Sequence, residues 1–68
     1  MTNLKILKKG TTIVDTKTGD WYQTTRVQQV LDGNIYVRNI ENAVGNEEVI
    51  RYEYVGYPQQ HKRYEIRL

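Results

Sequence analysis

The chain has no cysteine, no serine and no phenylalanine, and it has a single histidine, His61. Without cysteine it can form neither a disulfide nor a thiolate metal site, which fits a cytoplasmic protein. Without cysteine and serine it lacks the two commonest catalytic nucleophiles. A lone histidine completes neither a triad nor a two-histidine metal site. We therefore expect no enzyme activity, no catalytic residue, no metal site and no cofactor.

Long hydrophobic runs are also missing. No apolar stretch approaches the roughly 20 residues of a membrane span, and the N-terminus lacks the apolar block of a signal peptide. The 68 residues allow one domain, residues 1–68, with a small core. Met1 at the start fits a free-standing chain. We expect a single small cytoplasmic domain with no membrane segment.

The net charge of +2 is small, but its distribution is uneven. Residues 1–10 carry three lysines and no acid, residues 59–68 carry three bases and one acid, and the stretch between them has a net charge of −3. If the two ends of the chain meet in the fold, they form one basic patch suited to phosphate groups. The alternative is that both ends are ordinary solvated termini.

Valine, isoleucine, threonine and tyrosine runs separated by turn residues predict strands, and no window shows helical periodicity. Asp32-Gly33 is a hairpin signal, because Gly readily adopts the positive φ that such turns need. Pro58 stops a ladder of backbone hydrogen bonds. The expected strands are residues 4–7, 11–16, 21–31, 34–40, 47–55 and 62–67.

Two-residue alternation along these strands predicts which side chains face the core. The strand over 21–31 has inward candidates of both parities, Val27 and Leu31 against Val30, so we expect a bulge near Gln28-Gln29. In the strand over 47–55, Val49 and Val55 share the face opposite Ile50. The other inward side chains expected are Ile35, Val37, Ile50, Tyr52, Tyr54, Tyr64, Ile66 and Leu68.

The predicted fold class is all-β. Five to six short antiparallel strands in so short a chain cannot form a flat sandwich with much core. They suit a small, partly open barrel in which one long bent strand belongs to both halves.

The stretch "TGDWYQTTRVQQVLDGNIYV" resembles the centre of a Tudor-type domain, and "ENAVGNEEVI" resembles the loop that follows in that family. Small KOW-type barrel proteins have a similar opening, and some have a basic ending similar to "HKRYEI". Both families share the SH3-like barrel. The resemblance covers residues 11–55 and implies an SH3-like (Tudor/KOW-type) barrel.

The Tudor resemblance also implies a binding site for a methylated lysine or arginine, held in an aromatic cage by cation–π attraction. Trp21 or Tyr22, together with Tyr36, match two positions of that cage. The loop over 40–46 contains no aromatic residue, so the cage is incomplete. We expect Trp21 to be the more buried of the adjacent pair and Tyr22 to face outward near Tyr36.

Two functional hypotheses follow from these residues. The first is a protein-interaction module, a small regulator or inhibitor of the kind that phages and mobile elements encode, which docks through a tyrosine-rich face or a sheet edge. Its candidate binding residues are Trp21, Tyr22, Tyr36, Tyr52, Tyr54 and Tyr57.

The alternative is a nucleic-acid-binding barrel in which exposed aromatic rings stack on bases. Its candidate phosphate contacts are Lys5, Lys8, Lys9, Lys62, Arg63 and Arg67. A weaker reading is an assembly part whose sheet edge pairs with copies of itself. The sequence leaves the oligomeric state open.

Overall fold

The computed structural model describes residues 6–29, 33–41 and 46–67. This part of the chain is all-β, with short strands, two three-residue 3-10 helices and no α-helix. Four strands pair in chain order as an antiparallel meander, with one short strand of a separate sheet between the second and the third of them. They are β2 (Thr12–Asp15), β3 (Trp21–Thr24), β5 (Asn34–Asn39) and β6 (Glu48–Arg51).

The chain then turns back across the start of the meander. The 3-10 helix η2 (Tyr52–Tyr54) leads into β7 (Val55–Gly56), and a second one, η3 (Pro58–Gln60), precedes β8 (Tyr64–Arg67). β8 pairs antiparallel with β2, and β7 pairs parallel with β8.

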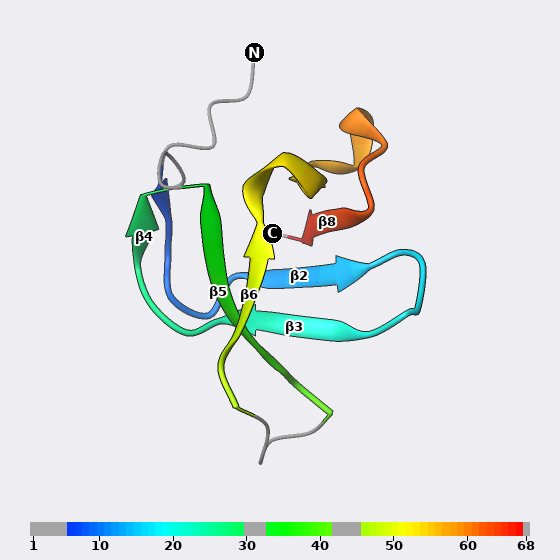
Figure 1. Ribbon diagram of the computed structural model, residues 1–68. Coiled ribbons are helices and arrows are strands. Elements are labelled where there is room, and N and C mark those ends of the chain that lie inside the picture. Colours follow the sequence, from blue (N-terminus) through cyan, green and yellow to red (C-terminus); the bar gives the residue numbers. More distant parts are fainter. Residues whose placement is uncertain (1–5, 30–32, 42–45, 68) are drawn as a thin grey trace.

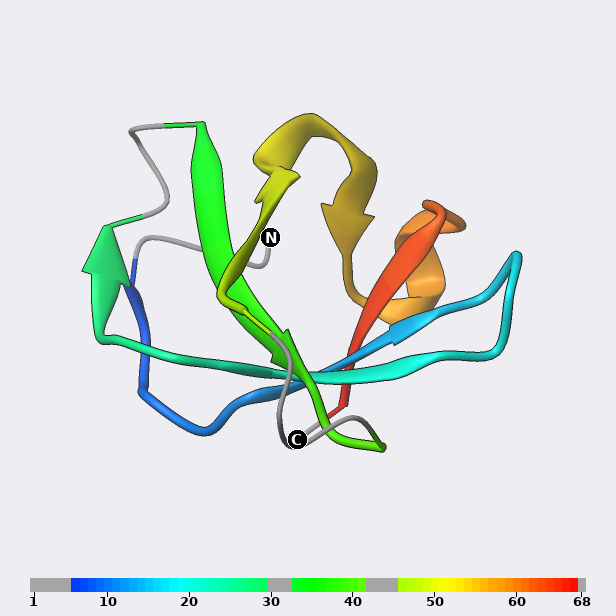
Figure 2. The ribbon, with the colours of Figure 1, turned by 60° about the horizontal axis from the view of Figure 1, so that its bottom comes forward.

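The six strands form one mixed sheet in the order β6-β5-β3-β2-β8-β7. Figures 1 and 2 show this sheet curling so that its two end strands approach each other. Because β6 and β7 are not paired with each other, the result is a nearly closed, partly open barrel. The expected all-β, partly open barrel is therefore confirmed, but the strands are not all antiparallel as expected, because β7 runs parallel to β8.

A separate two-stranded sheet lies beside the barrel. It pairs β1 (Ile6–Leu7) with β4 (Gln28–Gln29). The expected first strand began at residue 4, and residues 4 and 5 lie outside the described part of the chain.

The buried core cluster is aliphatic. Alternate residues point into the barrel, and the predicted inward residues Ile35, Val37, Ile50 and Ile66 are all buried. Leu7, Ile13 and Val55 complete the core cluster. The rim of this cluster is formed by tyrosines whose hydroxyl groups can stay in contact with water. They are Tyr22, Tyr52, Tyr57 and Tyr64.

The long strand expected over 21–31 is broken. β3 ends at Thr24, and β4 begins at Gln28, so the break comes before the expected bulge. Val27, expected inside, is 66 % exposed. In the described part of the chain β4 pairs with β1 rather than with β5, and the hairpin expected at Asp32-Gly33 falls partly outside that part. Val30, Leu31 and Asp32 lie outside the described residues.

The prediction of one continuous strand over 47–55 is also wrong. The strand ends at Arg51, where the amide of Tyr52 donates a hydrogen bond to the carbonyl of Gly33 (2.8 Å) and η2 begins. A 3-10 turn has three residues per turn, so the two-residue alternation is lost there. Tyr54 is consequently 54 % exposed instead of inward. Val49 is exposed and Val55 is buried, so they do not share a face.

Candidate ligand-binding surface

A row of polar and basic side chains crosses four neighbouring strands on the outside of the barrel. Thr12 on β2 is paired with Arg67 on one side and with Gln23 on the other, and Gln23 is paired with Arg38 on β5. Residues directly opposite each other in a sheet point to the same face. We call these four residues the basic row. Arg67, Gln23 and Arg38 are exposed.

Two residues further along the same strands, the outer face is apolar. Trp21 is paired with Val14, and the amide of Ile40 donates to the Trp21 carbonyl (2.9 Å). Trp21 is 47 % exposed and Ile40 is 41 % exposed. We call these two residues the apolar shelf. Within the described part of the chain, the Trp21 ring makes no ring–ring or cation–π contact.

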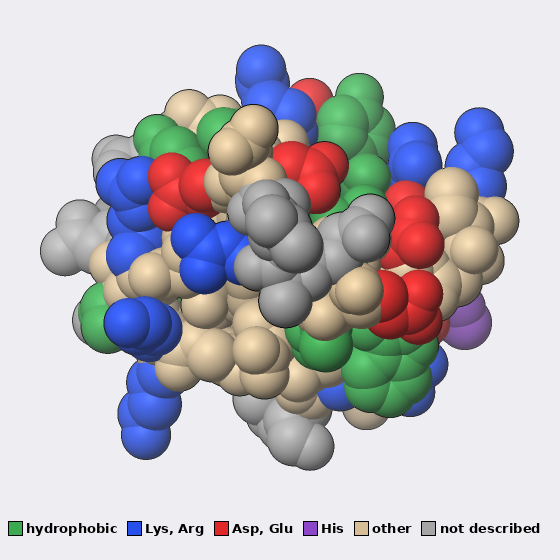
Figure 3. Space-filling view, turned by 90° about the horizontal axis from the view of Figure 1, so that it is seen from below, with side chains coloured by type: hydrophobic (Ala, Val, Ile, Leu, Met, Phe, Trp, Pro, Cys, Tyr) green, Lys and Arg blue, Asp and Glu red, His purple; other side chains and the backbone are tan. Residues whose placement is uncertain are grey.

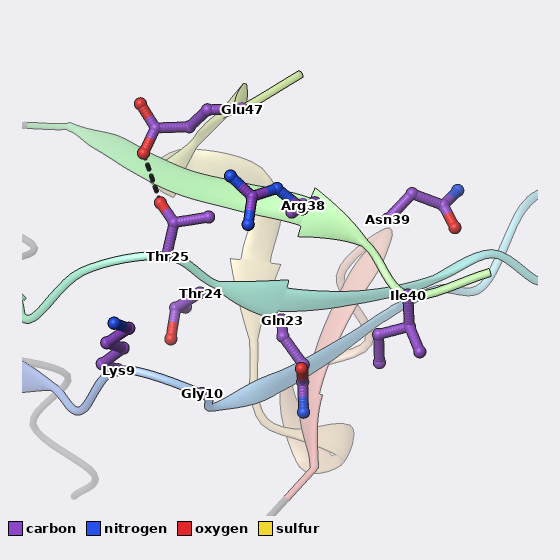
Figure 4. A pocket seen from close by; sticks show the side chains of 9 residues that line it. All are labelled: Lys9, Gly10, Gln23, Thr24, Thr25, Arg38, Asn39, Ile40 and Glu47. Carbon is purple, nitrogen blue, oxygen red and sulfur yellow. Dashed lines mark hydrogen bonds between the residues drawn. The ribbon is translucent and has the colours of Figure 1, made fainter. Parts of the chain in front are cut away.

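A depression of about 500 Å³ lies along β3, and its lining includes Gln23 and Arg38 of the basic row and Ile40 of the apolar shelf. Figure 4 shows Lys9 on one side of it and Arg38 on the other, with Thr25 between them and Gln23 farther along β3 toward Ile40. Among the described residues, Lys9 and Arg38 form no ion pair, so both charges are available to a ligand. The remaining lining residues are Gly10, Thr24, Asn39 and Glu47.

Thr24 fixes the position of Lys9. Thr24 is 3 % exposed, and its hydroxyl both accepts from the Thr11 amide (2.9 Å) and donates to the Lys8 carbonyl (2.8 Å). Its carbonyl accepts from the amide of Gly10 (2.9 Å). Gly10 has a φ of +86°, a conformation that favours glycine, and this turn holds both lysines next to β3.

The acid in the depression is already compensated. Glu47 forms an ion pair with Arg26 (2.6 Å between Oε1 and Nη2) and accepts a hydrogen bond from the Thr25 hydroxyl. The Arg26 hydrogen bond, followed by the one from Thr25, lowers the pKa of Glu47. The Arg26 guanidinium also stacks 3.8 Å from the centre of the Tyr36 ring. The depression therefore keeps the positive character of Lys9 and Arg38.

The structure reverses the expected roles of the adjacent aromatic residues. Tyr22 lies opposite fully buried Ile13, packs against the core and meets Tyr64 edge-on, with ring centres 6.5 Å apart. Burial raises the pKa of the Tyr22 hydroxyl. Trp21 points to the outer face instead. The expectation that Trp21 would be the more buried was wrong, because the strand begins one residue out of phase with the assumed core face.

The structure does not bring the cage aromatics together. Trp21 lies beside Ile40, which is four residues from Tyr36 on the same chain segment, a separation of roughly 13 Å at strand spacing. Tyr22 faces inward, and Tyr36 already carries the Arg26 cation on its ring. Residues 42–45 of the expected cage loop lie outside the described part of the chain.

The other predicted tyrosines are divided between core and surface. Tyr52 and Tyr57 are half-buried and pack against the core, while Tyr54 is exposed. Each keeps its predicted binding role only as a hypothesis. Most of the tyrosine-rich segment supports the barrel rather than forming one open face.

The basic termini meet only in part. Lys8 and Lys9 lie beside the start of β2, and Arg67 is paired with Thr12 at the same end. Arg63 directly precedes the first residue of β8, at the opposite end of that strand, and forms an ion pair with Asp15. The Lys62 amine is 6.0 Å from the Tyr52 ring, apart from this group. Lys5, also predicted as a phosphate contact, is outside the described residues.

Sequence reasoning missed Thr12, Gln23 and Arg38. Arg38 stood in the sequence as an isolated base in an acidic stretch. Arg38 becomes part of the basic row because the β3–β5 register places it next to Gln23.

In Figure 3, several Lys and Arg side chains gather at the left of one face, and a hydrophobic patch lies at its lower right beside acidic side chains.

Within residues 6–29, 33–41 and 46–67, no three His, Asp or Glu side chains come close enough to hold a metal ion. No helix in those ranges is long and apolar enough to cross a membrane. The described residues form a small all-β barrel with a basic, partly apolar outer face. No family model matches the chain, and neither a curated protein nor a solved structure matches it.

Proposed function

We propose that this protein is a non-enzymatic nucleic-acid-binding barrel that contacts phosphates through the basic row and Lys9. The observation that carries the proposal is the alignment of Arg67, Thr12, Gln23 and Arg38 across four strands, next to a depression with an uncompensated lysine. Arginine and lysine neutralise phosphates, and threonine and glutamine side chains also donate hydrogen bonds to them.

The chain order supports an SH3-like barrel as the finer identity of the fold. A four-stranded meander, a 3-10 turn after the fourth strand and a final strand that pairs back onto the first are the arrangement expected for that class. The resemblance to KOW-type barrels agrees with it. Barrels of several classes bind nucleic acid on an outer strand face.

The test is the salt dependence of binding. A fluorescently labelled oligonucleotide of mixed sequence is titrated with the protein between about 50 and 200 mM salt, and anisotropy gives the affinity. Contacts to phosphate by Lys9, Arg38 and Arg67 predict a slope of log K against log salt of roughly −2 to −3. Replacing one of these bases with glutamine reduces the slope by about one unit.

Arg51→Gln is the matched control. Arg51 is also exposed, but it lies on β6, outside the basic row and the lining of the depression, so its loss leaves the slope unchanged. Binding that ignores salt, or an Arg38→Gln variant identical to the wild type, contradicts the proposal.

Docking of a protein partner is the second candidate. It is favoured by the outer edge of β6, which has no strand partner among the described residues, and by exposed Val49 and Tyr54 nearby. A pull-down from lysate with and without nuclease separates the two: a partner that survives nuclease favours docking, and loss of the bound material favours nucleic acid.

A further inference from the structure

We propose that the nucleic acid is single-stranded, with its phosphates on the basic row and one base stacked on Trp21. This inference rests on the proposed function and names the form of its ligand. It draws on a feature that phosphate binding alone does not use, the apolar shelf beside the basic row.

The spacing of the two features fits one nucleotide. Gln23 and Trp21 are two residues apart on β3 and point to the same face, so the basic row and the apolar shelf are separated by roughly 7 Å. That is comparable to the distance between the phosphate and the base within a nucleotide. A strand whose phosphates follow the row therefore places its bases over the shelf.

The shelf offers a flat apolar surface only to an unpaired base. Trp21 is 47 % exposed, and its ring has no aromatic or cationic partner among the described residues. Aromatic side chains bind single strands by stacking on base faces, which every base possesses. In a duplex these faces are covered by neighbouring base pairs, so Trp21 and Ile40 would gain little contact.

The acids around the shelf fix which side the phosphates take. Glu65 is paired with Val14, the residue opposite Trp21, and therefore lies in the line of the shelf. Its carboxylate also binds Arg67 (2.9 Å), and Asp20 directly precedes Trp21. Phosphates over the shelf would approach these carboxylates, whereas over the basic row they approach Arg38 and Lys9.

The depression can take the neighbouring nucleotide. Lys9 and Arg38 both line it and can contact the phosphate of that nucleotide, and Gln23, which is paired with Arg38, can donate a hydrogen bond to the same phosphate. Ile40 connects the depression with the shelf, since it belongs to both. Successive nucleotides would thus lie on the shelf and in the depression.

Trp21 is the only tryptophan, so its fluorescence reports directly on the shelf. The probes are a short oligothymidylate, a duplex of the same length, inorganic polyphosphate and polyglutamate. Affinity is measured by competition with the labelled oligonucleotide, and quenching of Trp21 is measured separately. We expect saturable quenching by the oligothymidylate and an affinity roughly tenfold or more above that for the duplex.

Two variants test the role of the ring. Trp21→Leu is expected to lose about tenfold or more in affinity for the oligothymidylate while keeping the salt slope. Trp21→Tyr keeps a stacking ring and is expected to retain most of the affinity. Thermal unfolding of both variants shows whether each is folded at the assay temperature. Arg38→Gln is expected to show the opposite pattern, with a smaller slope and quenching retained at saturation.

The outcomes separate the two proposals. Equal salt-dependent binding of the duplex and the single strand, with Trp21→Leu unaffected, overturns the inference and leaves the proposed function standing. Polyphosphate that competes as well as the oligothymidylate overturns the stacking step in the same way. Binding of polyglutamate alone overturns both and indicates an acidic protein partner.

Discussion

Asp15 and Arg63, which are 48 positions apart, form a two-pronged ion pair, with Nη2–Oδ2 at 2.9 Å and Nε–Oδ1 at 3.2 Å. The Asp15 side chain is 2 % exposed and also accepts from the amides of Lys17 and Thr18. Thr16 donates to the Arg63 carbonyl with both its amide and its hydroxyl. The β2–β3 turn is thereby fixed to the segment before β8, which holds the barrel together between its first and last strands.

Asp15→Asn is expected to lower the free energy of unfolding by about 2–3 kcal/mol. The amide keeps the size of the side chain but has one acceptor oxygen in place of two, and it leaves Arg63 without its counter-ion. Urea denaturation at neutral pH measures the loss. Glu53→Gln is the control, because it removes the same charge from an exposed pair at 3.9 Å and is expected to cost under about 0.5 kcal/mol. Equal losses in the two variants would contradict the role given to Asp15.

The same ion pair predicts acid sensitivity. The Arg63 hydrogen bonds lower the pKa of Asp15, although burial opposes this shift. Below the usual aspartate pKa of about 3.9, the unfolded chain binds a proton that the folded chain still excludes, so stability falls with falling pH. Above that value the contribution of Asp15 is complete.

Urea midpoints measured from about pH 7 to about pH 2.5 check this dependence. Asp15→Asn is expected to show a shallower decline below about pH 4 than the wild type. Glu47, whose pKa is also lowered, adds a decline of the same sign, and the Glu47→Gln variant isolates it. Parallel curves for the wild type and Asp15→Asn would rule out the linkage.

The fold class could be predicted because turn residues and two-residue alternation are local signals. Ile35, Val37 and Ile66 are buried as the alternation indicates. The 3-10 turn at Tyr52 and the break after Thr24 were missed, because both depend on contacts with residues distant in sequence. The amide of Tyr52 donates a hydrogen bond to the carbonyl of Gly33, and the amide of Thr25 donates one to the carbonyl of Tyr36 (3.0 Å).

The candidate site was only partly predictable. Lys8, Lys9 and Arg67 stood out as charges near the ends of the chain. Thr12 and Gln23 carry no signal of their own, since their importance arises from the register of β8, β2, β3 and β5. A shift of one residue in that register would move the Gln23 side chain from the outer face to the core face. The local sequence does not specify which strand pairs with which, so this register could not be predicted.

Tyr22 is expected to stabilise the fold more than Trp21 does. Tyr22→Ala removes a ring that packs on the core, whereas Trp21→Ala removes a ring that is about half exposed, so the first variant has the lower urea midpoint. A double-mutant cycle with Tyr64→Ala is expected to give a coupling of about 0.5–1.5 kcal/mol for the edge-on Tyr22–Tyr64 pair. The same cycle between Trp21 and Tyr64 is expected to give a coupling near zero. A lower urea midpoint for Trp21→Ala than for Tyr22→Ala would contradict this assignment and indicate that Trp21 packs in the core.

Arg26 is expected to act on binding through Glu47. Glu47 lines the depression, and Arg26 neutralises it, so Glu47→Gln removes a residual negative charge and should raise oligonucleotide affinity roughly two- to fivefold at low salt. Arg26→Gln exposes that charge to Lys9 and Arg38 and should lower affinity by a similar factor. The double variant should return close to the wild type, because no charge is left to compensate. Anisotropy titrations of the four proteins provide the comparison, and the differences should shrink at high salt. A double variant as weak as Arg26→Gln would mean that Arg26 contacts the nucleic acid itself.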